Sequence, residues 1–131
     1  MAEHAYIRFQ SPVADARGRF VGVFGLVNTL AKQGLLTTVQ EQFRRTNNDW
    51  YDAAYPNPAA SDPSVYDHDI NPGAAAWFKS TAVHLLVPVD GYLEILAAHD
   101  VACVRLESVS APGRVIYEDE CQVIVVPDEE A

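Results

Sequence analysis

Basic residues and cysteines are both scarce in this sequence. Nine lysine and arginine residues stand against eighteen aspartate and glutamate residues, which gives a net charge of −9. A surface of that sign repels nucleic-acid phosphates and anionic lipids, so neither nucleic acid nor a membrane is an expected partner. The two cysteines, Cys103 and Cys121, lack the paired spacing of zinc sites. We expect both thiols to be reduced and structural.

Long hydrophobic runs are also missing. The longest one, from Phe20 to Val27, is interrupted by Gly22 and Gly25. It is far shorter than the roughly 20 residues that a membrane-spanning helix needs. The first residues, Met-Ala-Glu-His, contain neither the basic nor the apolar stretch of a secretion signal. These features predict a cytoplasmic protein.

No signature of a bound cofactor is present. The sequence contains no phosphate-binding loop, dinucleotide fingerprint, G-x-S-x-G or H-E-x-x-H pattern, so we expect no cofactor and no resident metal. An apolar fraction of 49% and a charged fraction of 21% are typical of a globular chain. At 131 residues, the sequence predicts a single domain over 1–131, with residues 127–131 as a disordered acidic tail.

The first third of the chain predicts a strand and a helix. Polarity alternates over residues 6–10, which indicates a strand. Helical periodicity then runs from about residue 17 to residue 33 and carries a second stripe, of Gly18, Gly22 and Gly25. Interior glycines cost a helix about 1 kcal/mol each relative to alanine. The stripe therefore predicts a close crossing by another element, a contact with a protein partner, or a homodimer.

End signals mark two further helices. Thr38 and Glu41 fit a capping box, and a helix that begins there must end before Pro56. Asn71 and Pro72 fit the N-cap and first position of a third helix, which the apolar pattern extends to about residue 85.

The last third predicts one more helix and then strands. Asp90 is placed to cap a helix that ends near His99. Strand patterns follow over 102–107, 115–117 and 121–126, separated by turn residues. The fold class is therefore α+β, with an N-terminal strand, about four helices and a C-terminal three-stranded antiparallel meander, which the first strand could join.

The densest polar and aromatic run covers residues 44–52, Arg-Arg-Thr-Asn-Asn-Asp-Trp-Tyr-Asp. Its side chains can hydrogen-bond and stack on a polar ligand, and the proline-rich loop 56–72 that follows could complete the surface. The alternative is a solvated helix face with Trp50 in the core. The candidate ligand-binding residues are Arg45, Asn47, Asn48, Asp49, Tyr51, Tyr66 and His68.

Within that loop, Asp67, His68 and Asp69 place an imidazole between two carboxylates. Such a set could bind a divalent metal, or an aspartate could orient His68 as a general base. In an extended backbone the two carboxylates would share a face and His68 would point away. This peptide alone cannot close a site, so we assign no metal to it.

The segment 112–123, Pro-Gly-Arg-Val-Ile-Tyr-Glu-Asp-Glu-Cys-Gln-Val, carries a resemblance. Together with Asn-Asp-Trp-Tyr at 48–51 and Asn-Pro-Gly at 71–73, it resembles small conserved actinobacterial proteins of unknown function. The resemblance covers most of the chain and implies no activity and no functional residue.

Three functions remain open. The leading hypothesis is a non-catalytic binding or accessory protein for a protein partner or a small polar ligand, because no nucleophile, base and orienting group stand in a recognisable arrangement. The second is a small enzyme or metal-assisted hydrolase. Its residues would be Asp67, His68, Asp69, Asn48, Asp49 and Tyr51. The third is an acidic immunity or inhibitor protein that acts on a basic partner.

Overall fold

The computed structural model describes residues 6–54, 63–67, 69–71 and 73–126. Three helices of ten residues or more and a five-stranded sheet make the protein α+β, as the sequence predicts. Within these described ranges, no helix is long and apolar enough to cross a membrane. The tail predicted at 127–131 lies outside them.

The chain folds into two compact units that interleave in sequence. The helical unit comprises residues 9–55 and 84–105. The sheet unit comprises residues 1–8, 56–83 and 106–131. The chain therefore passes from one unit to the other four times.

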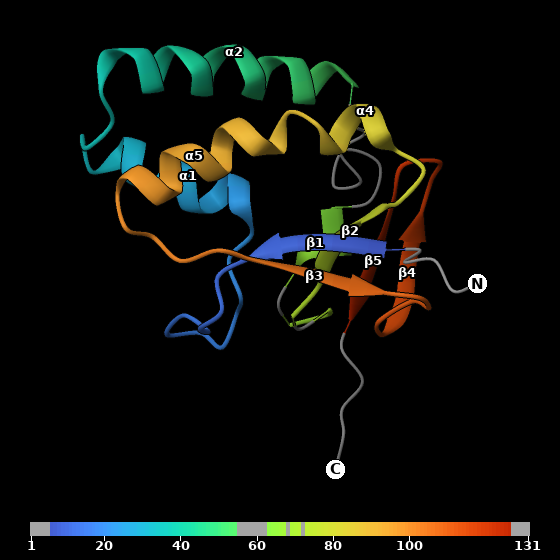
Figure 1. Cartoon of the computed structure of the whole chain (residues 1–131). Helices are drawn as coiled ribbons and strands as arrows, with labels where there is room; N and C mark the ends of the chain where they lie inside the picture. The colour runs from blue at the N-terminus through green and yellow to red at the C-terminus, as the bar shows by residue number, and fades with distance from the viewer. Residues whose placement is uncertain (1–5, 55–62, 68, 72, 127–131) are drawn as a thin grey trace. The chain divides into compact units, whose positions relative to one another are not determined.

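Most of the helical unit is three helices that lie side by side (Figure 1). They are α1 (Val23–Lys32), α2 (Thr38–Ala54) and α5 (Val89–Ala98). A single helical turn, α4 (Val83–Leu86), comes shortly before α5. The core consists of apolar side chains from α1 and α5, which recur at helical spacing and pack against one another. These buried residues are Val23, Val27, Leu30, Val89, Tyr92, Ile95 and Leu96.

The first helix is shorter than the sequence predicts. Gly18 has a φ of +78° and lies in a turn that the Asp15 carboxylate holds, because its Oδ1 accepts hydrogen bonds from the N–H groups of Arg17 and Arg19. Gly22 is extended and caps the helix. Only Gly25 is helical, so the predicted glycine stripe does not exist as one helix face. The partner contact and the homodimer predicted through these glycines stay predictions.

The second helix begins where the sequence predicts, but its capping box lies one residue earlier. The Thr37 Oγ1 accepts a hydrogen bond from the Gln40 N–H, and the Gln40 side chain accepts one from the Thr37 N–H. This is the reciprocal arrangement of a capping box. Glu41, predicted as its acidic member, instead pairs with arginines further along α2. The helix runs to Ala54, consistent with the predicted end before Pro56.

The predicted capping role of Asp90 is wrong, although the predicted helix is present. Pro88 occupies the N-cap of α5, with no side-chain hydrogen bond to the first turn. Asp90 lies within that first turn, where a negative charge interacts favourably with the helix dipole.

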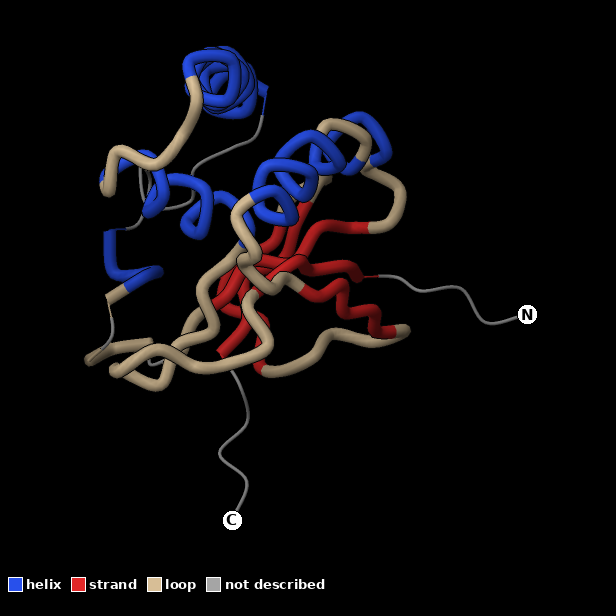
Figure 2. Tube along the Cα trace, turned by 60° about the vertical axis from the view of Figure 1, so that its left-hand side comes forward, coloured by secondary structure: helices blue, strands red, loops and turns tan. Residues whose placement is uncertain are grey.

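The sheet has the strand order β3-β1-β2-β5-β4. Figure 2 shows its strands in red. The strands are β1 (Tyr6–Gln10), β2 (Ala75–Lys79), β3 (Val104–Ser108), β4 (Arg114–Glu118) and β5 (Gln122–Val126). The predicted C-terminal meander is wrong, because β3 lies at the edge opposite β4 and neighbours β1. The division between the two units falls inside β1 and inside β3.

Strand β2 corrects the helix predicted over 71–85. Gly73, with a φ of +74°, turns the chain into β2, which pairs antiparallel with β1 and with β5. The Asn71 side chain donates to the Ser64 carbonyl instead of capping a helix. Aromatic residues favour strands, and Phe78 is 5% exposed in this interior strand. Pairing with two neighbouring strands thus outweighs the helical spacing of the apolar residues.

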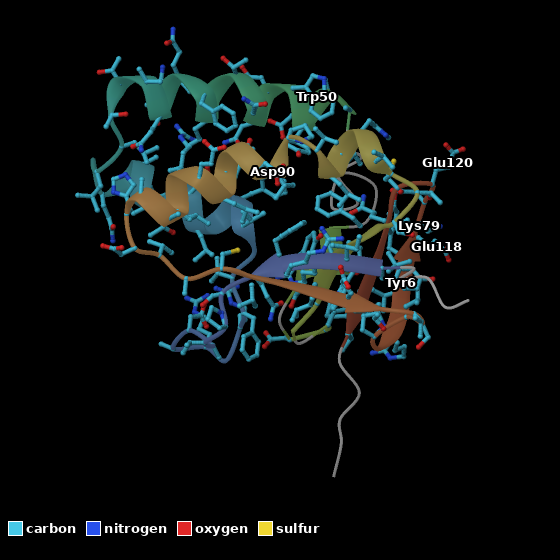
Figure 3. All side chains as sticks on the ribbon, in the orientation of Figure 1. Tyr6, Trp50, Lys79, Asp90, Glu118 and Glu120 are labelled. Carbon is cyan, nitrogen blue, oxygen red and sulfur yellow. The ribbon has the colours of Figure 1, made fainter. Side chains whose placement is uncertain are left out.

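The β4–β5 hairpin is closed by the Asp119 carboxylate. Its Oδ1 accepts the N–H groups of Cys121 and Gln122 at 2.8 and 3.0 Å. Its Oδ2 accepts the Tyr117 hydroxyl at 2.8 Å and the Gln122 side-chain amide at 3.0 Å. Lys79 of β2 forms an ion pair with Glu118 of β4 at 2.6 Å, beside this hairpin (Figure 3). The acidic turn therefore stabilises the hairpin through hydrogen bonds, in addition to any effect of its charge on solubility.

Candidate functional site

Polar side chains of three helices meet on the inner face of α2. The Asn28 Oδ1 on α1 accepts hydrogen bonds from Arg44 and Asn48 on α2, each at 3.1 Å. The Asn48 Oδ1 in turn accepts the Tyr92 hydroxyl of α5 at 2.7 Å. A polar run that looks like a ligand site in the sequence thus supplies hydrogen bonds between helices.

An aromatic cluster continues this contact toward the core. Tyr92 is fully buried, and the rings of Phe24, Phe43 and Tyr51 surround it at centroid distances of 5.0, 5.3 and 5.9 Å in edge-on orientations. The Tyr51 hydroxyl donates to the Leu85 carbonyl at 2.7 Å. Burial raises the pKa of both Tyr51 and Tyr92. Both phenols are therefore neutral hydrogen-bond donors, not proton-transfer groups near neutral pH.

Glu41 anchors the first part of α2 through two arginines. Its Oε2 lies 2.7 Å from Arg44 and 2.8 Å from Arg45, and its Oε1 accepts a further bond from Arg44. These charge-assisted bonds lower the pKa of Glu41 from 4.5 to about 2.

Acid should weaken the helical unit through this group. Because the folded-state pKa lies below the unfolded one, the stabilisation is complete above about pH 4.5 and is lost as the pH falls toward 2. We expect the melting temperature of Glu41→Gln to fall less than that of the wild type over this range. Circular dichroism melts between pH 2 and 6 measure this difference. The matched control is Asp49→Asn, an exposed carboxylate on the same helix, which should keep the wild-type slope; equal slopes in all three proteins would contradict the assignment.

The other predicted site residues fall in several places. Arg45 and Asp49 are exposed on α2, whereas the Asn47 amide bonds the Phe43 carbonyl one turn back. Asn48 and Tyr51 face inward, as described above. Tyr66 belongs to the sheet unit, in the short 3-10 helix η1 (Pro63–Tyr66), and is 45% exposed.

His68 lies outside the described residues, so a shared site with it stays a prediction. Its neighbour Asp67 holds the local turn, since its Oδ1 accepts the N–H groups of Asp69 and Ile70. In the part of the chain that the structure describes, no three histidine, cysteine, aspartate or glutamate side chains form a group that could hold a metal ion.

The thiol of Cys121 is poorly suited to nucleophilic chemistry. Burial raises its pKa, and the negative charges of Asp119 and Glu120 raise it further. A protonated thiol is a weak nucleophile. Cys121 and Cys103 are both half-buried.

An open groove lies between α2 and α5, and the sequence analysis did not identify it. Its volume is about 350 Å³, room for about ten water molecules. Its lining residues are Val39, Gln40, Phe43, Gly91, Glu94, Ile95 and Ala98. The signals in the sequence are the i,i+4 pair Val39 and Phe43, and a glycine inside the last helix.

Gly91 gives the groove its floor. A Cβ atom on this residue would lie within 3 Å of the Phe43 ring, so only glycine lets the ring approach α5 this closely. Val39, at the edge of the groove, is 74% exposed. Its side chain is therefore accessible from solvent.

Comparison of the chain with protein-family models, with curated proteins and with solved structures finds no match. The site is therefore assigned on its own geometry, and the resemblance to small actinobacterial proteins stays a prediction.

Proposed function

We propose that this protein is a non-catalytic binding protein whose groove between α2 and α5 receives an apolar side chain of a protein partner. The observation that carries the proposal is the groove itself, with its apolar lining and the exposed Val39 at its edge. Small hollows of this kind, lined by apolar groups and a few polar ones, are where proteins bind side chains or small molecules.

The state of the reactive side chains supports binding over catalysis. Glu41 is neutralised by two arginines, Asn48 is bonded to two neighbouring helices, and Tyr51 is bonded to a backbone carbonyl. Groups engaged in this way hold the helices together. The enzyme alternative based on Asp67, His68 and Asp69 stays a prediction, as does the immunity or inhibitor alternative.

The test uses N-acetyl-leucinamide, the simplest probe that presents a leucine side chain. Titration into isotope-labelled protein should shift the backbone amide resonances of Val39, Gly91 and Ala98 in ¹H–¹⁵N correlation spectra. Ala98→Trp, which fills the groove, should abolish these shifts at the same probe concentration. Ala98 is exposed, as is its neighbour Ala97, which serves as the control below, so a tryptophan at either position should not alter the fold.

The matched control is Ala97→Trp, the neighbouring exposed position on α5 that does not line the groove. It should retain the shifts. Shifts that spread over the whole surface, or that survive in Ala98→Trp, would contradict the proposal.

A further inference from the structure

The groove has a single charged residue in its lining, Glu94. The other lining groups are apolar, apart from the Gln40 amide, which is hydrogen-bonded to His99 at 3.0 Å. A carboxylate at the edge of an apolar hollow leaves a negative potential where a partner must enter. The groove therefore favours an occupant that is apolar in one part and cationic in the adjacent part.

Neighbouring charges on α5 strengthen this preference. Asp90 precedes Glu94 by one helical turn, and both side chains are exposed. Like charges at this spacing repel one another. Among the described residues, neither carboxylate takes part in an ion pair, whereas Arg44 and Arg45 are both engaged by Glu41. A cation of a binding partner could therefore pair with either carboxylate. Only the Asp90 carboxylate is also stabilised by the helix dipole, because it lies in the first turn of α5.

We infer that the occupant of the groove is a segment of another protein that carries a lysine or arginine next to its apolar anchor. The apolar side chain enters the groove between Val39 of α2 and Ala98 of α5, and the cation lies beside Glu94. This inference rests on the proposed function, because it names the partner class for the same groove. A second copy of this chain is a poorer occupant, since it would bring a net charge of −9 toward a surface that is already negative.

Three tripeptides with the same central leucine separate charge from apolar contact. They are acetyl-Lys-Leu-Lys-amide, acetyl-Gln-Leu-Gln-amide and acetyl-Glu-Leu-Glu-amide. Exposed ion pairs contribute modestly, so we expect the lysine peptide to shift the Val39, Gly91 and Ala98 amides with a Kd about two- to fivefold lower than the glutamine peptide. The glutamate peptide should bind most weakly, and raising the salt concentration should reduce the differences.

Variants assign the effect to one carboxylate. Glu94→Gln should reduce the advantage of the lysine peptide over the glutamine peptide, because only Asp90 then remains, whereas the control Asp49→Asn, an exposed carboxylate of α2 outside the groove, should preserve the full difference. If the lysine peptide binds Glu94→Gln and the wild type with the same advantage, its attraction is to overall charge and the inference is wrong.

Further outcomes separate this inference from the proposed function. Equal binding of all three peptides, abolished by Ala98→Trp, would keep the groove as a binding site and overturn its preference for a cation. Absence of groove shifts with every peptide would overturn both. Sedimentation that shows a dimer, together with amide resonances of the groove that change on dilution, would make a second copy the occupant and overturn the inference.

Discussion

Replacing Tyr92 with alanine should lower the free energy of unfolding by about 3–5 kcal/mol, which is among the largest effects of any single substitution in the helical unit. The side chain is fully buried, three aromatic rings contact it edge-on, and its hydroxyl donates to Asn48. Alanine would remove all of these contacts and leave a cavity between α1, α2 and α5. Urea unfolding followed by circular dichroism measures the loss.

Tyr92→Phe separates the ring from the hydroxyl. It keeps the aromatic packing and removes the bond to the Asn48 Oδ1, so we expect a loss of only about 1–2 kcal/mol. Val39→Ala, at a side chain that is 74% exposed, is the control and should change stability by less than about 0.5 kcal/mol. Equal losses for Tyr92→Ala and Val39→Ala would show that Tyr92 is not a core residue.

Asp119→Ala should destabilise the protein by about 3 kcal/mol, because one carboxylate accepts four hydrogen bonds at the β4–β5 turn. Two of them come from Gln122, which is 1% exposed and would lose this acceptor inside the sheet unit. Burial of Asp119 opposes its charge, but the hydrogen bonds dominate and lower its pKa. Its contribution to stability is thus present near neutral pH and declines in acid.

The neighbouring Glu120 provides the matched control for this substitution. It is exposed and adjacent in sequence, so Glu120→Ala should alter stability by less than about 0.5 kcal/mol. Asp119→Asn should be intermediate, since an amide retains one accepting oxygen but cannot accept at both positions. The measurement is the urea concentration at the midpoint of unfolding. If Asp119→Ala unfolds at the same midpoint as the wild type, the Asp119 carboxylate does not stabilise the turn.

The features predicted best from the sequence are those that local chemistry determines. The strand at 6–10, the extent of α2 and the strands near 115–117 and 121–126 follow from periodicity and turn residues. The position of β3 in the sheet, next to β1, could not be predicted in this way. Pairing with β1 instead of β4 joins segments that are almost a hundred residues apart, and no local signal encodes that choice.

The helix predicted over 71–85 failed for a related reason. An apolar stretch with aromatic residues fits both a buried helix and an interior strand, and only the two neighbouring strands decide between them. The glycine stripe failed because Gly18 and Gly22 serve a turn and a cap, roles that helical spacing cannot reveal.

For the site, the sequence located a dense polar run but not the direction of its side chains. Asn48 and Tyr51 point inward and Arg45 and Asp49 outward, which depends on how α2 packs on α1 and α5. The groove combines residues 39–43 with residues 91–98, about fifty positions apart. Its existence depends on how α2 packs on α5, and the sequence indicates it only through the apolar pair Val39 and Phe43 and the glycine inside α5.

The position of β1 in the sheet has a consequence during synthesis on the ribosome. Both neighbours of β1 are made later, and the residue that pairs with Ile7 is Phe78. At about 5–20 residues per second, the nascent strand waits roughly 4–14 seconds for that partner. Ile7 and Phe9, both buried in the finished protein, remain uncovered by this sheet throughout the delay. The order of synthesis thus leaves two core side chains of β1 without their strand partners until β2 has been made.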